Sequence, residues 1–360
     1  MTTKRLNIKH RNRLLVIVPV ICVLLTIVSG DRFAGAREIT DMVGRTVTIG
    51  QVKKVWPAYP PVAYLVYALD PSLLVGWTAN LSPESKKYIR APQQELPVIG
   101  GWFGQRMPNM ENLIAVKPDV ALVWDQTLSI TPNMLEMLNK LGIPVLAVRI
   151  FFLSDYPEAF RFVGNVLDRN KRADELAGYI DQTIKEMKAF SNGIPHEKKV
   201  SVYYAIGADG LTDDCNHLPF LNDVINLAGG RYVHQCPSGD TAIGTKIDQE
   251  RLILYNPDVI ITQDDLFFSN VYSDSRYKLL RAVKNRKVYM IPRTPFNWLN
   301  YPPSFMRAIG VRWLAHTLYP DLYTTADIRK ETKRFFKLFL GVNLSNDEAD
   351  SLLLLKRKQR

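Results

Sequence analysis

Two cysteines and two histidines form a mirrored set in the second half of the chain. The segments are Cys215-x-His217 and His234-x-Cys236, and Asp213-Asp214 directly precedes the first of them. Thiolates and imidazoles are good ligands for Zn²⁺ and Ni²⁺, so four of them could hold a metal tetrahedrally. Their spacing is not that of a standard zinc finger. The set is therefore a weak metal-site candidate.

A disulfide is the other chemistry open to these cysteines. Cys22 lies inside an apolar N-terminal run, and once that run is removed Cys215 and Cys236 are the two cysteines that remain. Exported proteins meet an oxidising compartment in which such a pair forms a disulfide. We expect a Cys215–Cys236 disulfide, with a metal site or unpaired thiols as alternatives. His217 and His234 would then be weak candidates to cap a metal.

Aromatic and polar residues recur where short apolar strands end. Ligands of open parallel sheets bind beyond the carboxyl ends of the strands. Planar guanidinium groups suit oxygen-rich anions, and aromatic rings suit a flat or bulky ligand. For each aromatic residue, ordinary loop packing is the alternative. The candidate ligand-binding residues are Tyr59, Trp77, Trp102, Arg106, Trp124, Arg149, Asp209, Gln263, Arg293, Phe296 and Trp298.

The sequence contains little that resembles a catalytic motif. None of the four histidines beyond residue 36 lies in a recognisable nucleophile or metallohydrolase motif. Gly207-x-x-Gly210 lacks the flanking pattern of a phosphate-binding loop. Asp264 and Asp265 are adjacent, and neighbouring side chains on an extended loop point apart. We expect no enzyme activity and no cofactor, with a secreted hydrolase as the alternative.

An internal repeat indicates how these residues are positioned. The segments 110–123 (MENLIAVKPDVALV) and 249–262 (QERLILYNPDVIIT) align position by position. Each predicts a short amphipathic helix, a proline-aspartate turn and a buried strand. Between them, apolar residues of 170–190 recur at three- and four-residue steps, which predicts a long helix. The expected plan is two related α/β halves with parallel sheets, joined by that helix.

The first 36 residues have the features of an export signal. A basic start precedes the apolar run 14–28, which is too short for a membrane span of about 20 residues. Ala34-Gly35-Ala36 is a small-residue cleavage site, so we expect cleavage before Arg37, with an uncleaved anchor as the alternative. The mature protein is then soluble and periplasmic.

Charge and length limit the kinds of partner and the number of domains that this chain can have. The signal holds six basic residues and one acidic residue, so the net charge of +11 falls to +6 in the mature chain. A basic stripe interleaved with aromatic residues, as nucleic-acid binding needs, is not present. We therefore expect a mildly basic surface or an anionic ligand, and no nucleic-acid partner. With 360 residues, the chain suits two domains.

Several short motifs, in this order, resemble periplasmic substrate-binding proteins of ABC importers, in the class that takes ferric siderophores, haem and cobalamin. The resemblance runs from about residue 39 to 320. It is carried by Asp41-x-x-Gly44-Arg45, the strand and loop 55–61, Asn109–Ile114, Lys117–Val120, Leu221–Gly230, Ile247–Leu252, Asn256–Ile261 and Val283–Pro292.

The resemblance implies two Rossmann-like lobes, 37–153 and 193–360, joined by a helical linker, 154–192, after the signal 1–36. The ligand would lie in the cleft between the lobes, which close only modestly around it. A glutamate at the start of each repeat helix, here Glu111 and Glu250, would dock on an inner-membrane ABC permease dimer. The alternative for both is a first-turn glutamate favoured by the helix dipole.

The resemblance leaves the ligand open. It implies a metal chelate carried by a monomeric binding protein, with a ferric siderophore as the first expectation. Haem, cobalamin and a nickel or cobalt complex are alternatives. A binder of bare metal ions is a further one, although such proteins need several histidines facing the cleft.

Overall fold

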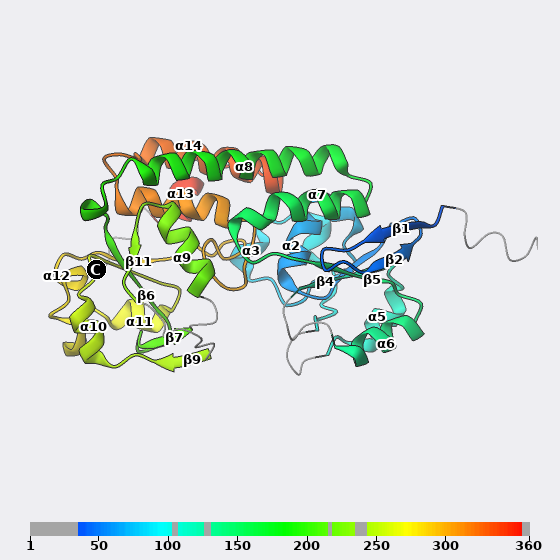
Figure 1. Cartoon of the computed structure of the whole chain (residues 1–360), viewed down its shortest axis with the longest axis horizontal. Helices are drawn as coiled ribbons and strands as arrows, with labels where there is room; N and C mark the ends of the chain where they lie inside the picture. The colour runs from blue at the N-terminus through cyan, green and yellow to red at the C-terminus, as the bar shows by residue number, and fades with distance from the viewer. Residues whose placement is uncertain (1–34, 103–106, 126–130, 215–217, 235–242, 355–360) are drawn as a thin grey trace, which may run out of the picture.

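The computed structural model describes residues 35–102, 107–125, 131–214, 218–234 and 243–354. They form two α/β lobes, each built around a parallel sheet, and a layer of helices that spans both (Figure 1). The fold class expected from the sequence is confirmed. In this part of the chain, no helix has both the length and the apolar character that a membrane span needs.

The N-terminal lobe has a parallel sheet in the order β3-β4-β5. Every residue of β4 and β5 is buried, as is typical of parallel strands covered on both faces. The parallel bridges Val55–Leu74 and Trp77–Val98 continue this sheet beyond β3. Its elements are the antiparallel hairpin β1 (Arg37–Thr40) and β2 (Thr46–Ile49), then β3 (Val55–Pro57), α2 (Pro60–Leu69), η1 (Pro71–Leu73), α3 (Pro83–Lys86), α4 (Ala91–Gln94), α5 (Met110–Val116), β4 (Val120–Trp124), α6 (Pro132–Lys140) and β5 (Val145–Val148).

The C-terminal lobe has a parallel sheet in the order β11-β10-β6-β8, and β7 and β9 form a small antiparallel ribbon. Strands β6 and β10 lie in the middle of the sheet and are entirely buried. The elements are η3 (His196–Lys198), β6 (Ser201–Ala205), β7 (Thr212–Asp214), α9 (Leu218–Leu227), β8 (Arg231–Tyr232), β9 (Ile243–Lys246), α10 (Gln249–Tyr255), β10 (Val259–Thr262), α11 (Asp265–Asn270), η4 (Ser275–Tyr277), α12 (Arg281–Lys284) and β11 (Val288–Met290).

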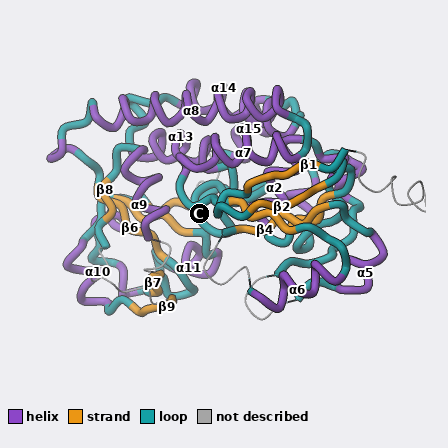
Figure 2. Tube along the Cα trace, turned by 45° about the vertical axis from the view of Figure 1, so that its right-hand side comes forward, coloured by secondary structure: helices purple, strands orange, loops and turns teal. Residues whose placement is uncertain are grey.

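The helical layer runs along one side of both lobes (Figures 1 and 2). The predicted long helix is α8, and Leu176, Ala177, Ile180 and Met187 of its apolar face are buried as expected. Through this layer the two lobes share one continuous apolar core. The layer consists of η2 (Leu153–Asp155), α7 (Tyr156–Val166), α8 (Asn170–Asn192), α13 (Arg307–Leu318), α14 (Thr325–Phe335), the π-helical turn η5 (Phe336–Leu340) and α15 (Asn346–Leu352).

The end of the chain returns to the N-terminal lobe. The ring of Phe336 packs edge-on against Tyr88, with 5.5 Å between centroids, and Arg172 of α8 donates to the carbonyl of Leu338. The last helices therefore bridge the lobes and do not belong to the second lobe alone.

The two copies of the internal repeat adopt the same local geometry. The side chain of Asn109 caps α5 by accepting from Asn112 N at 3.0 Å, and Asp248 caps α10 by accepting from Arg251 N at 2.6 Å. Both helices end at a left-handed residue, Lys117 (φ 45°) and Asn256 (φ 40°).

The repeated aspartate of the Pro-Asp turns ties each helix–strand unit to a neighbouring strand. Asp119 accepts from the backbone amides of Lys53 and Lys54, both at 2.8 Å, just before β3. Asp258 accepts from the amide and hydroxyl of Ser201, at 2.9 and 2.6 Å, at the start of β6. In each lobe, the aspartate of the Pro-Asp-Val pattern thus joins one strand to the start of its neighbour in the sheet.

Candidate functional site

A cavity of about 670 Å³ lies where the two lobes meet at the carboxyl ends of their strands. Residues 80–88, which follow the Trp77 bridge, line it from the N-terminal lobe, and residues 290–296, at the end of β11, line it from the C-terminal lobe. Tyr64 and residues 351–354 complete the lining. The volume is in the range of small-molecule sites. We call it the inter-lobe cavity.

Aromatic packing closes the inner wall of the inter-lobe cavity. Phe296 stacks on Tyr64 of the other lobe, with 3.8 Å between centroids and 22° between ring planes. Phe296 also lies 6.3 Å from the indole of Trp77. Beside this contact, the hydroxyl of Ser85 donates to the carbonyl of Pro295 at 2.9 Å. The wall is therefore made by both lobes and held by direct contacts between them.

Arg293 stands at the rim of the inter-lobe cavity, and its side chain is about half exposed. Its guanidinium donates to Gln263 O at 3.0 Å and pairs with Asp265 Oδ2 at 2.5 Å. The side chain of Gln263 is in turn fixed by the amide of Asn297 at 2.7 Å. Two of the predicted site residues, Gln263 and Arg293, are thus brought together.

The opposite lobe presents a similar pair. Arg149 follows β5, and its Nε lies 3.2 Å from Asp125 Oδ2, which follows β4. The Arg149 side chain is about half exposed. Exposed ion pairs contribute only about 0–1 kcal/mol, so a ligand carboxylate or oxyanion can replace the aspartate at small cost. Each lobe therefore offers one arginine that an anion can recruit.

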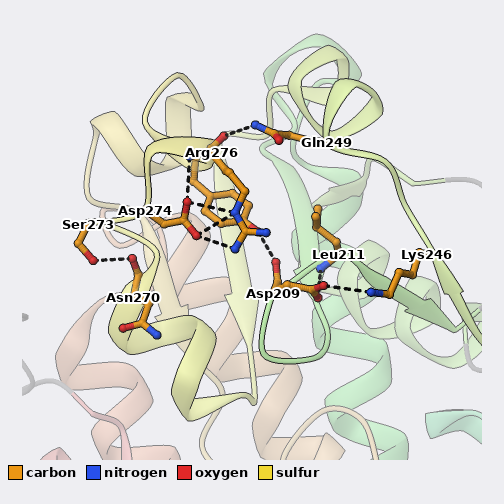
Figure 3. A network of polar contacts seen from close by, with 9 residues as sticks. Asp209, Leu211, Lys246, Gln249, Asn270, Ser273, Asp274 and Arg276 are labelled. Carbon is orange, nitrogen blue, oxygen red and sulfur yellow. Dashed lines mark hydrogen bonds and ion pairs between the residues drawn. The ribbon is translucent and has the colours of Figure 1, made fainter.

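Asp209 lies in the loop after β6 and belongs to a polar network (Figure 3). Its carboxylate accepts from Leu211 N at 3.1 Å and lies 3.5 Å from Lys246 Nζ. Its carbonyl accepts from the hydroxyl of Tyr277. Burial raises the pKa of Tyr277 to about 12, so this hydroxyl stays protonated and continues to donate.

The same network reaches the start of α10 (Figure 3). Arg276, next to Tyr277, pairs with Asp274 through Nε at 3.0 Å and Nη2 at 2.7 Å. The carbonyl of Arg276 accepts from the side chain of Gln249 at 3.1 Å. A chain of contacts therefore links the loop after β6 to the helix that carries Glu250.

The strand-end tryptophans lie mostly in the core. Trp124 and Trp298 are fully buried, and their indoles donate to Ile150 O and Thr294 O, both at 2.9 Å. Trp77, buried as well, donates to Gln93 O at 2.7 Å. Tyr59 and Trp102 are 6% and 8% exposed. In this conformation, packing accounts for the burial of Trp124 and Trp298, and these side chains support the cleft from behind.

Several sequence candidates fall outside the described residues: Arg106, Cys215, His217 and Cys236. His234 is described and buried, and its Nδ1 shares a hydrogen bond with the hydroxyl of Tyr255 at 2.9 Å. Across the residues that the structure describes, no group of three or more His, Cys, Asp or Glu side chains is arranged to hold a metal.

Sequence reasoning missed one wall of the inter-lobe cavity. Tyr64 lies inside a helix that is apolar throughout, and nothing in its pattern separates it from a core residue. The segment 80–88 carried a usable signal, because Asn80, Ser82 and Pro83 mark a turn directly after a strand.

Glu111 and Glu250 are both exposed and occupy the same position in the first turns of α5 and α10. The two helices lie in different lobes, at the end of the molecule away from the helical layer (Figures 1 and 2). Exposed isoleucines, Ile114 and Ile253, follow each glutamate by three residues. The two lobes thus present matching surfaces in the same direction.

Residues 65–295 match the sequence pattern of the family described as "Periplasmic binding protein". The matched segment starts within α2 and ends in the loop after β11, so it contains β4 and β5 of the first sheet, all four strands of the second sheet and the whole of α8.

Individual relatives agree with this match. The chain is 25% identical to molybdate-binding protein MolA of Haemophilus influenzae over 87% of this chain and 93% of that protein. It is 22% identical to the vitamin B12-binding protein of Pectobacterium atrosepticum, over 57% and 68%. The solved structure of an ABC transporter solute-binding protein from Sulfurospirillum deleyianum is 34% identical, with a TM-score of 0.78, covering 88% of this chain and 98% of that one.

Proposed function

Because the chain belongs to the periplasmic binding protein family of ABC importers, we propose that it captures an anionic metal complex between its lobes. The observation that carries the proposal is a pair of half-exposed arginines, one in each lobe, of which Arg293 lines the inter-lobe cavity. Arg149 and Arg293 both follow sheet strands, are about half exposed, and each pairs with a single aspartate. Guanidinium groups bind oxygen-rich anions with two parallel hydrogen bonds.

A ferric siderophore is our first candidate for the cargo. The inter-lobe cavity of about 670 Å³ has an aromatic wall as well as an arginine, which suits a bulky chelate with an organic frame. Haem would pack on the same aromatic wall, and its carboxylates would pair with the same arginine. Cobalamin and nickel or cobalt complexes rank lower, because a neutral or cationic ligand does not need the arginines.

Molybdate is a second candidate, since the relative similar over 87% of this chain is a molybdate-binding protein. A small tetrahedral oxyanion would sit between arginines and backbone amides, and it would not use the aromatic wall. The two candidates therefore differ in which side chains matter.

Delivery to the importer follows from the two matching surfaces. Glu111 and Glu250 are exposed at equivalent positions of the two lobes, so together they can pair with two arginines of a permease dimer. The shared core limits lobe motion, and the spacing of the two carboxylates would then change little on binding. In this role the protein is a carrier that makes and breaks no covalent bond.

The remaining assignments complete the proposal. Residues 1–36 direct export to the periplasm, and Cys215 pairs with Cys236 there. The lobes are 37–153 and 193–360, the last helices of the second also contacting the first, the linker is 154–192, and the mature protein is a monomer. The ligand-binding set is led by Arg149, Gln263 and Arg293, and its further members are Arg106, Asp209, Tyr59, Trp102 and Phe296, whereas Trp77, Trp124 and Trp298 are core residues that would act through packing.

A thermal-shift panel tests the cargo class. The purified protein is melted with ferric catecholate and ferric hydroxamate siderophores, molybdate, haem and cobalamin, each at several concentrations. A ligand that binds the folded state raises the melting temperature in proportion to the logarithm of its concentration. A shift with an anionic metal complex supports the proposal. A shift with cobalamin alone, or with none of the panel, contradicts it.

A further inference from the structure

A second cavity, of about 730 Å³, lies in the helical layer and has no part in the proposed cargo site. Its walls come from the end of α2, one face of α8, Arg90, and the end of α14 with the π-helical turn η5. The helical layer is at the end of the molecule away from α5 and α10 (Figures 1 and 2). This cavity, the linker groove, would stay open when those helices are docked.

The lining of the linker groove is rich in cations. Four basic side chains line it, Arg90, Arg172, Arg334 and Lys337, against two acidic ones, Asp70 and Glu175. Asp70 is already paired with Arg169 at 2.8 Å. The wall thus carries an excess of positive charge, although its two carboxylates are close by.

Two of these cations are held in place by the fold. Arg172 donates to Glu175 at 2.6 Å and to the carbonyl of Leu338. The guanidinium of Arg334 lies 5.2 Å from the ring centroid of Tyr179, in cation–π geometry. Arg334, whose side chain is 61% exposed, also lies 3.7 Å from Glu331 Oε1. These contacts limit the freedom of both guanidinium groups, so the side chains lose less entropy when they meet a ligand.

Arg90 and Lys337 are exposed, and among the described residues neither has a carboxylate within 4.0 Å. Arg90 lies against Gly341, where a Cβ would come within 2.6 Å of its Nη2. Gly341 also has φ +72°, which suits glycine at the end of a helix. Lys337 lies in the π-helical turn, a feature that often marks functional sites.

Gly178 lies at the point where the linker groove passes over α8. It lies in the middle of α8, where glycine is a poor helix former, and it lines the groove. A Cβ built at this position would meet no atom within 4 Å, and its φ is not in the left-handed region. Neither packing nor backbone geometry requires glycine at this position, so a side chain placed there would extend into the open groove.

We propose that the linker groove binds a small polyvalent oxyanion, a molecule with two or more phosphate or carboxylate groups. Arg172 and Arg334 would form the fixed wall, and Arg90 and Lys337 would close on the ligand. Two anionic groups are needed because the cations come from separate segments: residue 90, α8 and the α14–η5 helix. The proposal does not depend on the identity of the imported cargo.

Calorimetric titration of the purified protein with pyrophosphate, and separately with citrate, tests the proposal at about 150 mM salt, where non-specific attraction is screened. Gly178→Leu fills the groove without removing a charge, and Arg334→Ala with Lys337→Ala removes two cations. The control is Lys188→Ala, which removes an exposed cation of the same helix that does not line the groove.

Saturable binding of one equivalent of pyrophosphate or citrate is expected. It should weaken at least tenfold in Gly178→Leu and in the double variant, and less than twofold in Lys188→Ala. No saturable binding of either probe, or equal weakening in Lys188→Ala, overturns the proposal. Each variant is also melted, and a melting temperature that is not lowered assigns a lost affinity to the groove. If Gly178→Leu unfolds, Gly178→Gln replaces it.

Discussion

The ring of Phe296 stacks on the ring of Tyr64 with 3.8 Å between their centroids, and the two residues belong to different lobes. Phe296 is 3% exposed and follows the last strand of the second sheet, whereas Tyr64 lies in the first long helix of the other lobe. This contact lies beside the inter-lobe cavity and, with the shared core, joins the two lobes directly.

Replacing Phe296 by alanine should destabilise the whole protein. The buried ring contacts Tyr64, Trp77 and Phe305, so its loss leaves a cavity that costs about 3–5 kcal/mol. Chemical denaturation measures the difference. Tyr301→Ala, at a side chain that is 42% exposed, is the matched control and should cost far less. Equal effects of the two substitutions would show that Phe296 does not hold the lobes together.

Glu111→Ala combined with Glu250→Ala should abolish uptake of the cargo and leave its affinity unchanged, because both carboxylates lie on the outer ends of the lobes. Uptake in cells and binding to the purified protein are measured in parallel. Glu158→Ala with Glu197→Ala removes the same charge from other exposed positions and should leave uptake normal. Normal import by the Glu111→Ala, Glu250→Ala double variant, or weaker binding of the cargo to it, would contradict the proposed docking role.

The stability contributed by Asp258 should depend on pH. Burial raises the pKa of this carboxyl. Hydrogen bonds from Ser201 and the charge of Arg281 lower it by more, so the net pKa is below the usual 3.8. A carboxylate with a lowered pKa stabilises the folded state above its usual pKa and loses that contribution as pH falls. The difference in unfolding free energy between the wild type and Asp258→Asn should therefore shrink below about pH 4.

Ser201→Ala supplies the second measurement for Asp258. It removes the 2.6 Å hydroxyl bond and leaves the backbone bond at 2.9 Å, so part of the acid sensitivity should remain. If the difference in unfolding free energy between the wild type and Asp258→Asn does not depend on pH, the carboxylate charge does not stabilise the start of β6.

Gly178→Ala should stabilise the protein by about 0.5–1 kcal/mol, the usual gain for alanine over glycine inside a helix. The added methyl group meets no neighbouring atom, so no clash offsets the gain. Thermal and denaturant unfolding measure the change. A loss of stability would mean that α8 needs glycine for a reason other than open space.

The sequence predicted the repeated units well because each has local signals that tertiary packing does not override. Asn109 and Asp248 are helix caps by residue type, and the Pro-Asp turns stop the helices where the structure stops them. The apolar face of 170–190 gave the linker helix for the same reason. These features determine the lobes and the positions of Glu111 and Glu250.

The candidate site was harder to predict because burial depends on partners that are distant in sequence. Trp124 is the last residue of β4 and Trp298 lies in the loop after β11, as ligand-contacting residues would, but each indole donates to a backbone carbonyl inside the core. Tyr64 faces the cavity from a helix with no polar face. The return of Phe336 to Tyr88 crosses more than two hundred residues, which no local pattern encodes.

The most direct test of the proposed function is calorimetric titration of an anionic metal complex, a ferric siderophore or molybdate, into the wild type and into Arg293→Ala. Lys287→Ala is the control, since it removes an exposed cation at the opposite end of the same strand. We predict one equivalent bound by the wild type and by Lys287→Ala, with affinity at least tenfold weaker in Arg293→Ala. Equal affinities in all three proteins, or no binding of an anionic metal complex by the wild type, would contradict the proposal.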